Sequence, residues 1–327
     1  MTKPRQEAAY VKSSCGAIPG IKRFSHEAMA TTFEVMTVHE DERYAQQSAA
    51  ASFDELDRLE SELSRFIENS DISRINNVPA HQPLRIGPAS FECLQLGARI
   101  YAETKGAFDI TIGSLLACWL EEDMTIRSPS KEQLNLARQH TGMHLIKLDE
   151  AEHTVELLTS PVQIDLGGIG KGYALDRMGE LLREWSIDAA LIHGGFSSAV
   201  ALDKPPETNG WPLTLSDPGD RKRTFARICL ERRAVGGSGL QKGQHIIDPR
   251  TAKPVEGKHA TWAFAPDAAT ADALSTAFMV MAPDEIQQYC QHHPHVLAMV
   301  VLEAADKKPR KEKVLRFGPW HEAGLLK

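Results

Sequence analysis

The sequence predicts an α+β fold, because segments with a helical pattern of apolar residues and segments rich in β-forming residues both occur along its 327 residues. Apolar residues recur at intervals of three and four within residues 41–66, which predicts a long amphipathic helix. Residues 31–39 are rich in β-formers and predict a strand. The sequence contains no internal repeat and no Pro/Gly/Ser linker long enough to separate independent domains.

The remaining elements are expected in chain order. Helical patterns predict a short turn and three longer helices, at residues 69–76, 89–106, 131–140 and 267–281. A further helix is expected to carry Leu175, Met178 and Leu182 on one face. Strands are expected at residues 145–149, 154–158, 189–202, 211–216, 225–231, 261–266 and 295–303. Residues 106–120 are interpreted as a loop or short strand leading into an apolar helix, and residues 234–255 as a loop-rich crossing.

Composition narrows the classes of function. The net charge of −7 argues against a nucleic-acid partner, because such a partner requires a basic face. No window approaches the ~20 apolar residues of a membrane span, so no transmembrane segment is expected. Five scattered cysteines without a C-x-x-C pair indicate reduced thiols.

The beginning of the chain bears on domain organisation and location. It has no apolar core of a signal peptide, and the residues before Cys15 are too polar for a lipoprotein signal. We therefore expect a cytoplasmic protein with a flexible leader at residues 1–24 and a single domain at residues 25–327.

The stretch QIDLGGIGKGYALDRM, residues 163–178, places a carboxylate (Asp165), four glycines and Lys171 just before a helix. Its spacing matches neither a P-loop nor a Rossmann fingerprint. Glycines let a backbone approach a ligand closely, and a helix N-terminus favours anions, so the stretch could bind a phosphate. The alternative is a tight turn that needs glycine for packing alone.

The stretch TADALST places Asp272, Ser275 and Thr276 on one helical face. A carboxylate with two hydroxyls suits a hard cation such as Mg²⁺, which often takes only one or two protein carboxylates beside substrate phosphates. In the alternative interpretation, Ser275 and Thr276 bond back to carbonyls of the preceding turn.

The stretch HIIDPRT, residues 245–251, contains a histidine that is a natural general base. The alternative is an ordinary turn in which Asp248 caps its own backbone and Arg250 is solvated.

Taken in order, seven stretches resemble one family, the FAD:protein FMN transferases or ApbE family. They are MATTFEV, SDISRIN, GAFDITIGSLLACW, IDLGGIGKGYALDRM, AVGGSG, HIIDPRTAKPV and ADALSTA, between residues 29 and 277. The resemblance implies mixed, largely antiparallel sheets with flanking helices and an active site between two halves. It also implies a reaction in which Mg²⁺ sits on the FAD pyrophosphate, AMP leaves, and the FMN phosphate is joined to a threonine or serine of a flavoprotein acceptor.

The resemblance assigns roles to residues of this sequence. The carbonyl of Gly168 would join Asp272 and Thr276 around Mg²⁺, with Ser275 close by, and His245 would activate the acceptor hydroxyl. The expected FAD contacts are Met29, Phe66, Ala107, Phe108, Asp109, Asp165 and Lys171.

Some positions depart from the family pattern. Gly236-Gly237-Ser238-Gly239 stands where Ala-Thr-Ser-Gly is usual, and Phe196 stands where an acid is usual. The segment before His245 is short, and many family members are exported lipoproteins. Two alternatives to the transferase therefore stay open, namely an FAD pyrophosphatase that gives FMN and AMP, and a non-catalytic FAD-binding protein.

Overall fold

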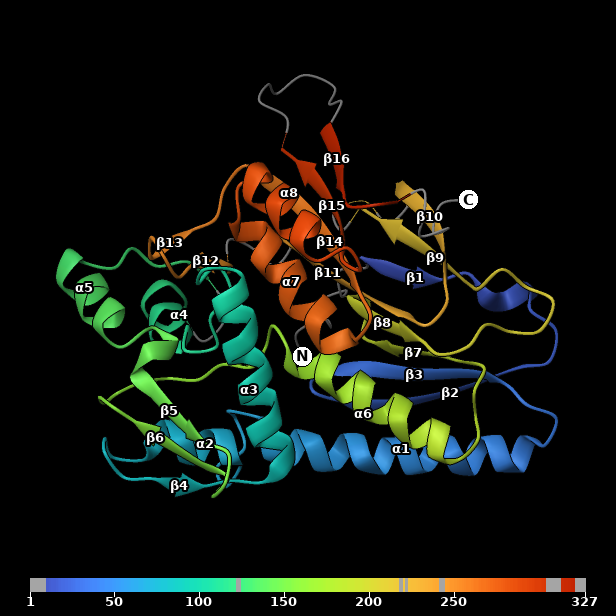
Figure 1. Cartoon of the computed structure of the whole chain (residues 1–327), viewed down its shortest axis with the longest axis horizontal. Helices are drawn as coiled ribbons and strands as arrows, with labels where there is room; N and C mark the ends of the chain where they lie inside the picture. Colours follow the sequence, from blue (N-terminus) through green and yellow to red (C-terminus); the bar gives the residue numbers. More distant parts are fainter. Residues whose placement is uncertain are drawn as a thin grey trace, which may run out of the picture.

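The computed structural model describes residues 10–121, 125–217, 220, 223–240, 245–303 and 313–320. Its centre is an eight-stranded sheet with the strand order β16-β15-β14-β11-β8-β7-β3-β2 (Figure 1). Every pairing between neighbours in this sheet is antiparallel. The strands are β2 (Ile21–Ala28), β3 (Thr31–Val38), β7 (Ala190–Gly194), β8 (Ser198–Ala201), β11 (Arg233–Gly239), β14 (Lys258–Ala265), β15 (Leu297–Leu302) and β16 (Lys313–Phe317). The predicted α+β fold with largely antiparallel sheets is confirmed.

The two faces of the central sheet are covered differently. Helices α1 (Glu42–Leu63), α6 (Gly170–Glu184) and α7 (Ala268–Val280) lie on one face, and α3 (Pro88–Glu103) packs against α7 and α1. A small sheet of β1 (Val11–Ser13), β9 (Trp211–Ser216) and β10 (Thr224–Leu230) covers the other face. A hydrophobic core lies on each face of the sheet, and strand β14 contributes side chains to both, because its residues alternate between the two faces.

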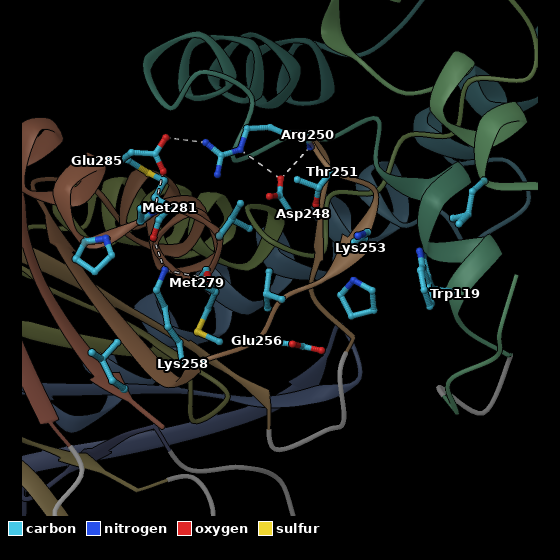
Figure 2. Close-up of a pocket in the computed structure, with 18 residues that line it drawn as sticks. Trp119, Asp248, Arg250, Thr251, Lys253, Glu256, Lys258, Met279, Met281 and Glu285 are labelled. Atoms are coloured by element: carbon cyan, nitrogen blue, oxygen red, sulfur yellow. Dashed lines mark hydrogen bonds and ion pairs between the residues drawn. The ribbon is translucent and has the colours of Figure 1, made fainter. Parts of the chain in front are cut away.

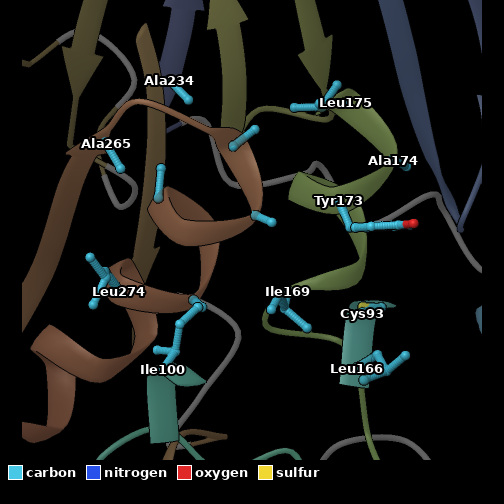
Figure 3. Close-up of a cluster of buried hydrophobic side chains, with 14 of the residues drawn as sticks. Cys93, Ile100, Leu166, Ile169, Tyr173, Ala174, Leu175, Ala234, Ala265 and Leu274 are labelled. Carbon is cyan, nitrogen blue, oxygen red and sulfur yellow. The ribbon is translucent and has the colours of Figure 1, made fainter. Parts of the chain in front are cut away.

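The alternation in β14 sets how closely the helices approach the sheet. Trp262 and Phe264 fill the core under the small sheet, whereas Ala263 and Ala265 face the helices. Figure 3 shows the helical core where α3, α6 and α7 meet, with Ile100, Tyr173 and Leu274 among its side chains. Small residues on this side of the sheet leave room for α7 to lie close to the strands.

A second group of elements lies at one end of the molecule (Figure 1). It contains the sheet β4-β6-β5 together with short helices. Its members are α2 (Asp71–Asn77), β4 (Leu84–Arg85), α4 (Gly113–Trp119), α5 (Lys131–Gln139), η2 (Met143–Leu145), β5 (Ile146–Asp149) and β6 (Thr154–Leu157). The other elements are η1 (Cys15–Ala17), the hairpin of β12 (Ile247–Asp248) and β13 (Lys253–Pro254), and α8 (Pro283–His292). None of the helices in the described ranges is long and apolar enough to cross a bilayer.

Side-chain caps explain where several helices begin. Asp41 accepts hydrogen bonds from the first turn of α1, and Ser70 accepts one from Ser73 in α2. Ser130 and Gln133 form a capping box at the start of α5. Asp267 caps α7 by accepting from the backbone N–H of Thr270.

The expected leader is shorter than predicted. Strand β1 pairs with β9, the Val11 side chain is fully buried, and β2 pairs with β3 from Ile21 onward. The prediction that residues 1–24 form a flexible leader is therefore wrong for residues 10–24, while residues 1–9 lie outside the described part of the chain. The partner of β1 lies about 200 residues away, so local sequence gives no sign of this pairing.

Two further predictions need correction. Residues 189–202 form two strands, β7 and β8, joined by a turn at Gly195, whose φ is +61°. The expected loop-rich crossing at residues 234–255 begins with β11, a strand inside the central sheet. Its glycines resemble a loop pattern because α7 packs directly on it: a Cβ at Gly236 would lie 2.4 Å from the carbonyl oxygen of Ala271.

Candidate active site

The site is centred on Asp272, in the second turn of α7. Its side chain is buried, and its carboxylate accepts hydrogen bonds from the Lys171 Nζ at 3.1 Å, the Gly172 backbone N–H at 3.2 Å and the Ser198 Oγ at 2.7 Å. These donors come from two residues of α6 and one of β8. The structure therefore brings together Lys171 and Asp272, which both the residue patterns and the resemblance had singled out.

The glycines of the turn before α6 have different functions. A Cβ at Gly172 would lie 2.1 Å from the carbonyl oxygen of Ala268, so only glycine lets α6 and α7 touch there. Gly168 instead faces the site: a Cβ there would lie 3.1 Å from the Phe108 ring and 3.4 Å from the Thr276 Oγ1. The packing explanation holds for Gly172, whereas Gly168 lies beside a residue predicted to bind the metal.

Hydroxyl groups form a second part of the site. The Ser238 Oγ lies 2.7 Å from the Ser275 Oγ and 3.2 Å from the Thr276 Oγ1. The Ser275 hydroxyl donates to the carbonyl of Asp272 at 2.7 Å, as the back-bonding interpretation expects. Thr276 is half-buried, whereas Ser275 is fully buried. Of the two hydroxyls on this helix face, Thr276 is the better placed to meet a ligand.

The donor set fits Mg²⁺ in its chemistry. Asp272 supplies a carboxylate, Thr276 a hydroxyl, and Gly168 a backbone beside Thr276, and their oxygens are hard donors. The described ranges contain no cluster of three or more His, Cys, Asp or Glu that could hold a metal on its own. A single carboxylate suits an ion that keeps several waters and takes its remaining ligands from phosphates.

Asp165 links the glycine turn to the loop between α1 and α2. Its carboxylate accepts from the Gly167 N–H at 2.7 Å and pairs with the Arg65 Nε at 2.8 Å. The Arg65 guanidinium lies 4.4 Å from the centre of the Phe66 ring, which is 82% exposed. Asp165 and Phe66 are thus connected through Arg65, and an exposed aromatic ring stands beside the turn.

The segment of Ala107, Phe108 and Asp109 is buried next to the same turn, where the Phe108 ring faces Gly168. Asp109 accepts hydrogen bonds from the backbone N–H of Thr111 at 2.8 Å and from its hydroxyl at 2.6 Å. Burial raises the pKa of Asp109 to about 6, against the opposing effect of these hydrogen bonds. This carboxyl group therefore titrates closer to neutral pH than an exposed aspartate.

Two predicted residues are placed by other contacts. Met29 lies in the β2–β3 turn with φ of +49°, and its N–H donates to the Glu60 Oε1 of α1 at 2.8 Å. His245 is half-buried, two residues before β12. Most of the short segment before it, residues 241–244, lies outside the described residues.

The turn after His245 agrees only in part with the alternative interpretation, in which it is an ordinary turn. Asp248 accepts from the Arg250 N–H at 2.9 Å, so it caps its own turn as the alternative predicted. Arg250 is not simply solvated, because it also pairs with the Glu285 Oε1 at 2.8 Å.

A pocket of about 930 Å³ lies beside this turn, between the β12–β13 hairpin and the C-terminal end of α7 (Figure 2). At its edge the Lys258 Nζ donates to the carbonyls of Phe278, Met279 and Met281. Burial lowers the pKa of Lys258 to about 8. None of the residues predicted to bind FAD or metal lines this pocket, so it is distinct from the Asp272 site.

Three residues of the site were missed from the sequence. Ser238 lies in a glycine-rich stretch that was interpreted as loop, and its strand position explains its contact with α7. Ser198 and Arg65 carry no local signal, because their partners are 74 and 100 residues away in the chain.

Comparisons with known proteins agree with the resemblance in the motifs. The family model that matches is the ApbE family, over residues 29–301. An FAD:protein FMN transferase of Klebsiella pneumoniae is 26% identical over 292 residues, which cover 85% of this chain and 83% of that protein. Another, from Chlamydia muridarum, is 29% identical over 248 residues, which cover 72% of this chain and 75% of that protein.

Solved structures agree as well. The ApbE protein of Thermotoga maritima superimposes with a TM-score of 0.81 at 26% identity, covering 93% of this chain and 99% of that one. The apo form of the Pseudomonas stutzeri flavinyl transferase ApbE gives a TM-score of 0.82 at 23% identity, covering 93% and 96%, which shows a shared fold.

Proposed function

This chain belongs to the ApbE family, and we propose from that premise that it is an FAD:protein FMN transferase. The observation that carries the proposal is the convergence of Lys171, Gly172 and Ser198 on the Asp272 carboxylate, with the Thr276 hydroxyl and Gly168 beside each other nearby. The enzyme would transfer the FMN part of FAD to a threonine or serine hydroxyl of a flavoprotein acceptor and release AMP.

In this proposal each group of residues has its own task. Asp272, Thr276 and the Gly168 carbonyl would hold Mg²⁺, and Ser275 would support them through its contacts with Ser238 and the Asp272 carbonyl. When bound there, Mg²⁺ would supply the positive charge that phosphoryl transfer mainly requires. Lys171 adds a positive charge at the N-terminus of α6, where phosphate groups are favoured.

The remaining residues bind FAD and move one proton. Met29, Phe66, Asp165 and the Ala107–Asp109 segment contact FAD, and Arg65 orients Asp165 and Phe66 together. His245 accepts the proton of the acceptor hydroxyl as its oxygen bonds to the FMN phosphorus. The bond from that phosphorus to the bridging oxygen breaks, and AMP leaves with that oxygen.

An FAD pyrophosphatase is the second candidate. It would use the same site with water in place of the acceptor hydroxyl, and the short segment before His245 favours it, because the acceptor side is where this sequence departs from the family. A non-catalytic FAD-binding protein would not need the paired Lys171 and Asp272.

One experiment separates the three functions. The protein is incubated with FAD, Mg²⁺ and a threonine-bearing candidate flavoprotein, and the acceptor mass and the nucleotides are measured in the same tube, with EDTA as control. A Mg²⁺-dependent gain of one FMN unit together with AMP supports the transferase. AMP with free FMN and no mass gain supports the pyrophosphatase, and intact FAD in every tube contradicts both enzymes.

A further inference from the structure

A second contact joins the two helices of the site, one turn away from Asp272. The Asp176 carboxylate of α6 accepts from the backbone N–H of Ala268 at 2.7 Å and from that of Ala269 at 2.8 Å. These N–H groups belong to the first turn of α7, which a helix leaves without partners of its own. Helix α7 already has its own cap, Asp267, so Asp176 is an additional cap supplied by another helix.

Asp176 is half-buried where α6 meets α7, and partial removal of its carboxylate from water is costly. Desolvation raises the pKa of Asp176 to about 7, and the nearby Asp267 and Glu180 act in the same direction. The hydrogen bonds from Ala268 and Ala269 oppose this shift, because they favour the charged form of the carboxylate. A carboxylate at this crossing is therefore better explained by what it holds in place.

The two contacts between the helices are in register. Gly172 and Asp176 are four residues apart on α6, and Ala268 and Asp272 are four residues apart on α7, so each pair lies on one helical face. Asp176 accepts from Ala268, and Gly172 donates to Asp272, while the bare Cα of Gly172 rests against the Ala268 carbonyl. Two points of attachment fix both the sliding and the rotation of α7 against α6.

We propose that Asp176 is a positioning residue that sets the register between α6 and α7 and thereby holds the Asp272 carboxylate against Gly172 and Lys171. It acts through the backbone of α7, because its own carboxylate is engaged by Ala268 and Ala269. The inference rests on the metal-binding role proposed above for Asp272.

The test measures Mn²⁺ binding by electron paramagnetic resonance, first without FAD and then with FAD but no acceptor protein. Asp176→Ala is compared with Asp267→Ala, which removes a cap from the same turn of α7 but leaves the attachment to α6. We expect Asp176→Ala to weaken Mn²⁺ binding about 10- to 100-fold, as loss of a supporting residue around a metal site does. Asp267→Ala should lower the melting temperature about as much as Asp176→Ala does, but it should bind Mn²⁺ like the wild type.

Two controls make the outcome decisive. Asp176→Asn keeps one acceptor oxygen and should give intermediate affinity, and it replaces Asp176→Ala if that variant does not fold. Equal Mn²⁺ affinity in the wild type and the Asp176 variants, or equal losses in the Asp176 and Asp267 variants, would overturn the positioning role alone. Wild-type protein that binds no Mn²⁺ through Asp272, judged against Asp272→Ala, would overturn it together with the proposed metal site.

Discussion

At the scale of single residues, the two neighbouring hydroxyls on α7 have different surroundings. Ser275 is buried and its hydroxyl donates a hydrogen bond to the Asp272 carbonyl, whereas Thr276 is half-buried beside Gly168 and Ser238. The sequence pattern alone treats the two as equivalent because both share a helical face with Asp272. Their difference depends on neighbours from β11 and from the glycine turn.

This difference predicts unequal effects of removing each hydroxyl. Thr276→Val keeps the shape of the side chain but removes a proposed metal ligand, so Mg²⁺-dependent AMP release should fall by about 100-fold or more, beyond the loss of a supporting residue. Ser275→Ala removes the supporting contacts with the Asp272 carbonyl and with Ser238 and should cost about tenfold, the low end for a supporting residue. Initial rates at several Mg²⁺ concentrations measure both variants, and equal losses would contradict the separate roles.

His193 predicts a pH dependence of stability. It lies on β7 between Glu34 and Ala199, and its Nε2 has no hydrogen-bond partner within the described residues. Burial lowers the pKa of His193 to about 4 from the ordinary 6.5, with Arg23 acting in the same direction. The unfolded chain therefore takes up a proton first as the pH falls, so the contribution of this residue is complete above pH ~6.5 and is lost towards pH ~4.

Between pH 7 and pH 4.5, the free energy of unfolding of the wild type should fall by up to about 3 kcal/mol more than that of His193→Leu. A pKa shift of this size implies that value. Urea unfolding at pH 7 and pH 4.5 measures it, with the exposed His292→Gln as control. If the wild type and His193→Leu lose the same free energy of unfolding between these two pH values, His193 is not the source.

At the scale of elements, α7 is stabilised at both ends by groups from other parts of the fold. Asp176 accepts from its first turn, and Lys258 of β14 donates to three carbonyls at its last turn. A negative group at the N-terminus and a positive group at the C-terminus both match the helix dipole. Most of α7 is buried, so water cannot easily replace these partners.

Lys258→Met should therefore destabilise the protein by about 2–3 kcal/mol, because it leaves buried carbonyls without donors. Lys253→Met is a matched control, since Lys253 lines the same pocket but is exposed on β13. Chemical denaturation measures both variants, and a loss for Lys258→Met no larger than that of the control would contradict the capping role.

Elements differed in how far the sequence could predict them. Helices α1, α6 and α7 follow from apolar periodicity, because this signal is local. Strand β11 could not be recognised, since its glycines are required by the close approach of α7 rather than by a turn. The pairing of β1 with β9 depends on a partner about 200 residues away.

At the scale of the whole molecule, the site depends on contacts between distant segments. Lys171 and Asp272 are 101 residues apart and meet only because α6 crosses α7 at Gly172. Local sequence patterns separately suggested an anion-binding turn within residues 163–178 and a cation-binding helix face that carries Asp272. The family resemblance placed them in one site, and that family assignment is confirmed by the match over residues 29–301.

The position of β1 leads to a prediction about the whole fold. We propose that residues from Tyr10 onward form a single domain, so deletion of residues 1–13 should lower the melting temperature by removing the buried Val11 and its pairing with β9. The loss of one such side chain costs about 1.5–3 kcal/mol. Calorimetry should show one transition in both proteins, and an unchanged melting temperature would contradict a structural role for β1.

The most direct test of the Asp272 site is a crystal structure with FAD and Mn²⁺, recorded with anomalous scattering from the metal. We predict a Mn²⁺ peak in contact with the Asp272 carboxylate, the Thr276 hydroxyl and the FAD pyrophosphate, beside Gly168. A metal peak elsewhere, or FAD bound in the pocket between the β12–β13 hairpin and α7, would contradict the proposed site.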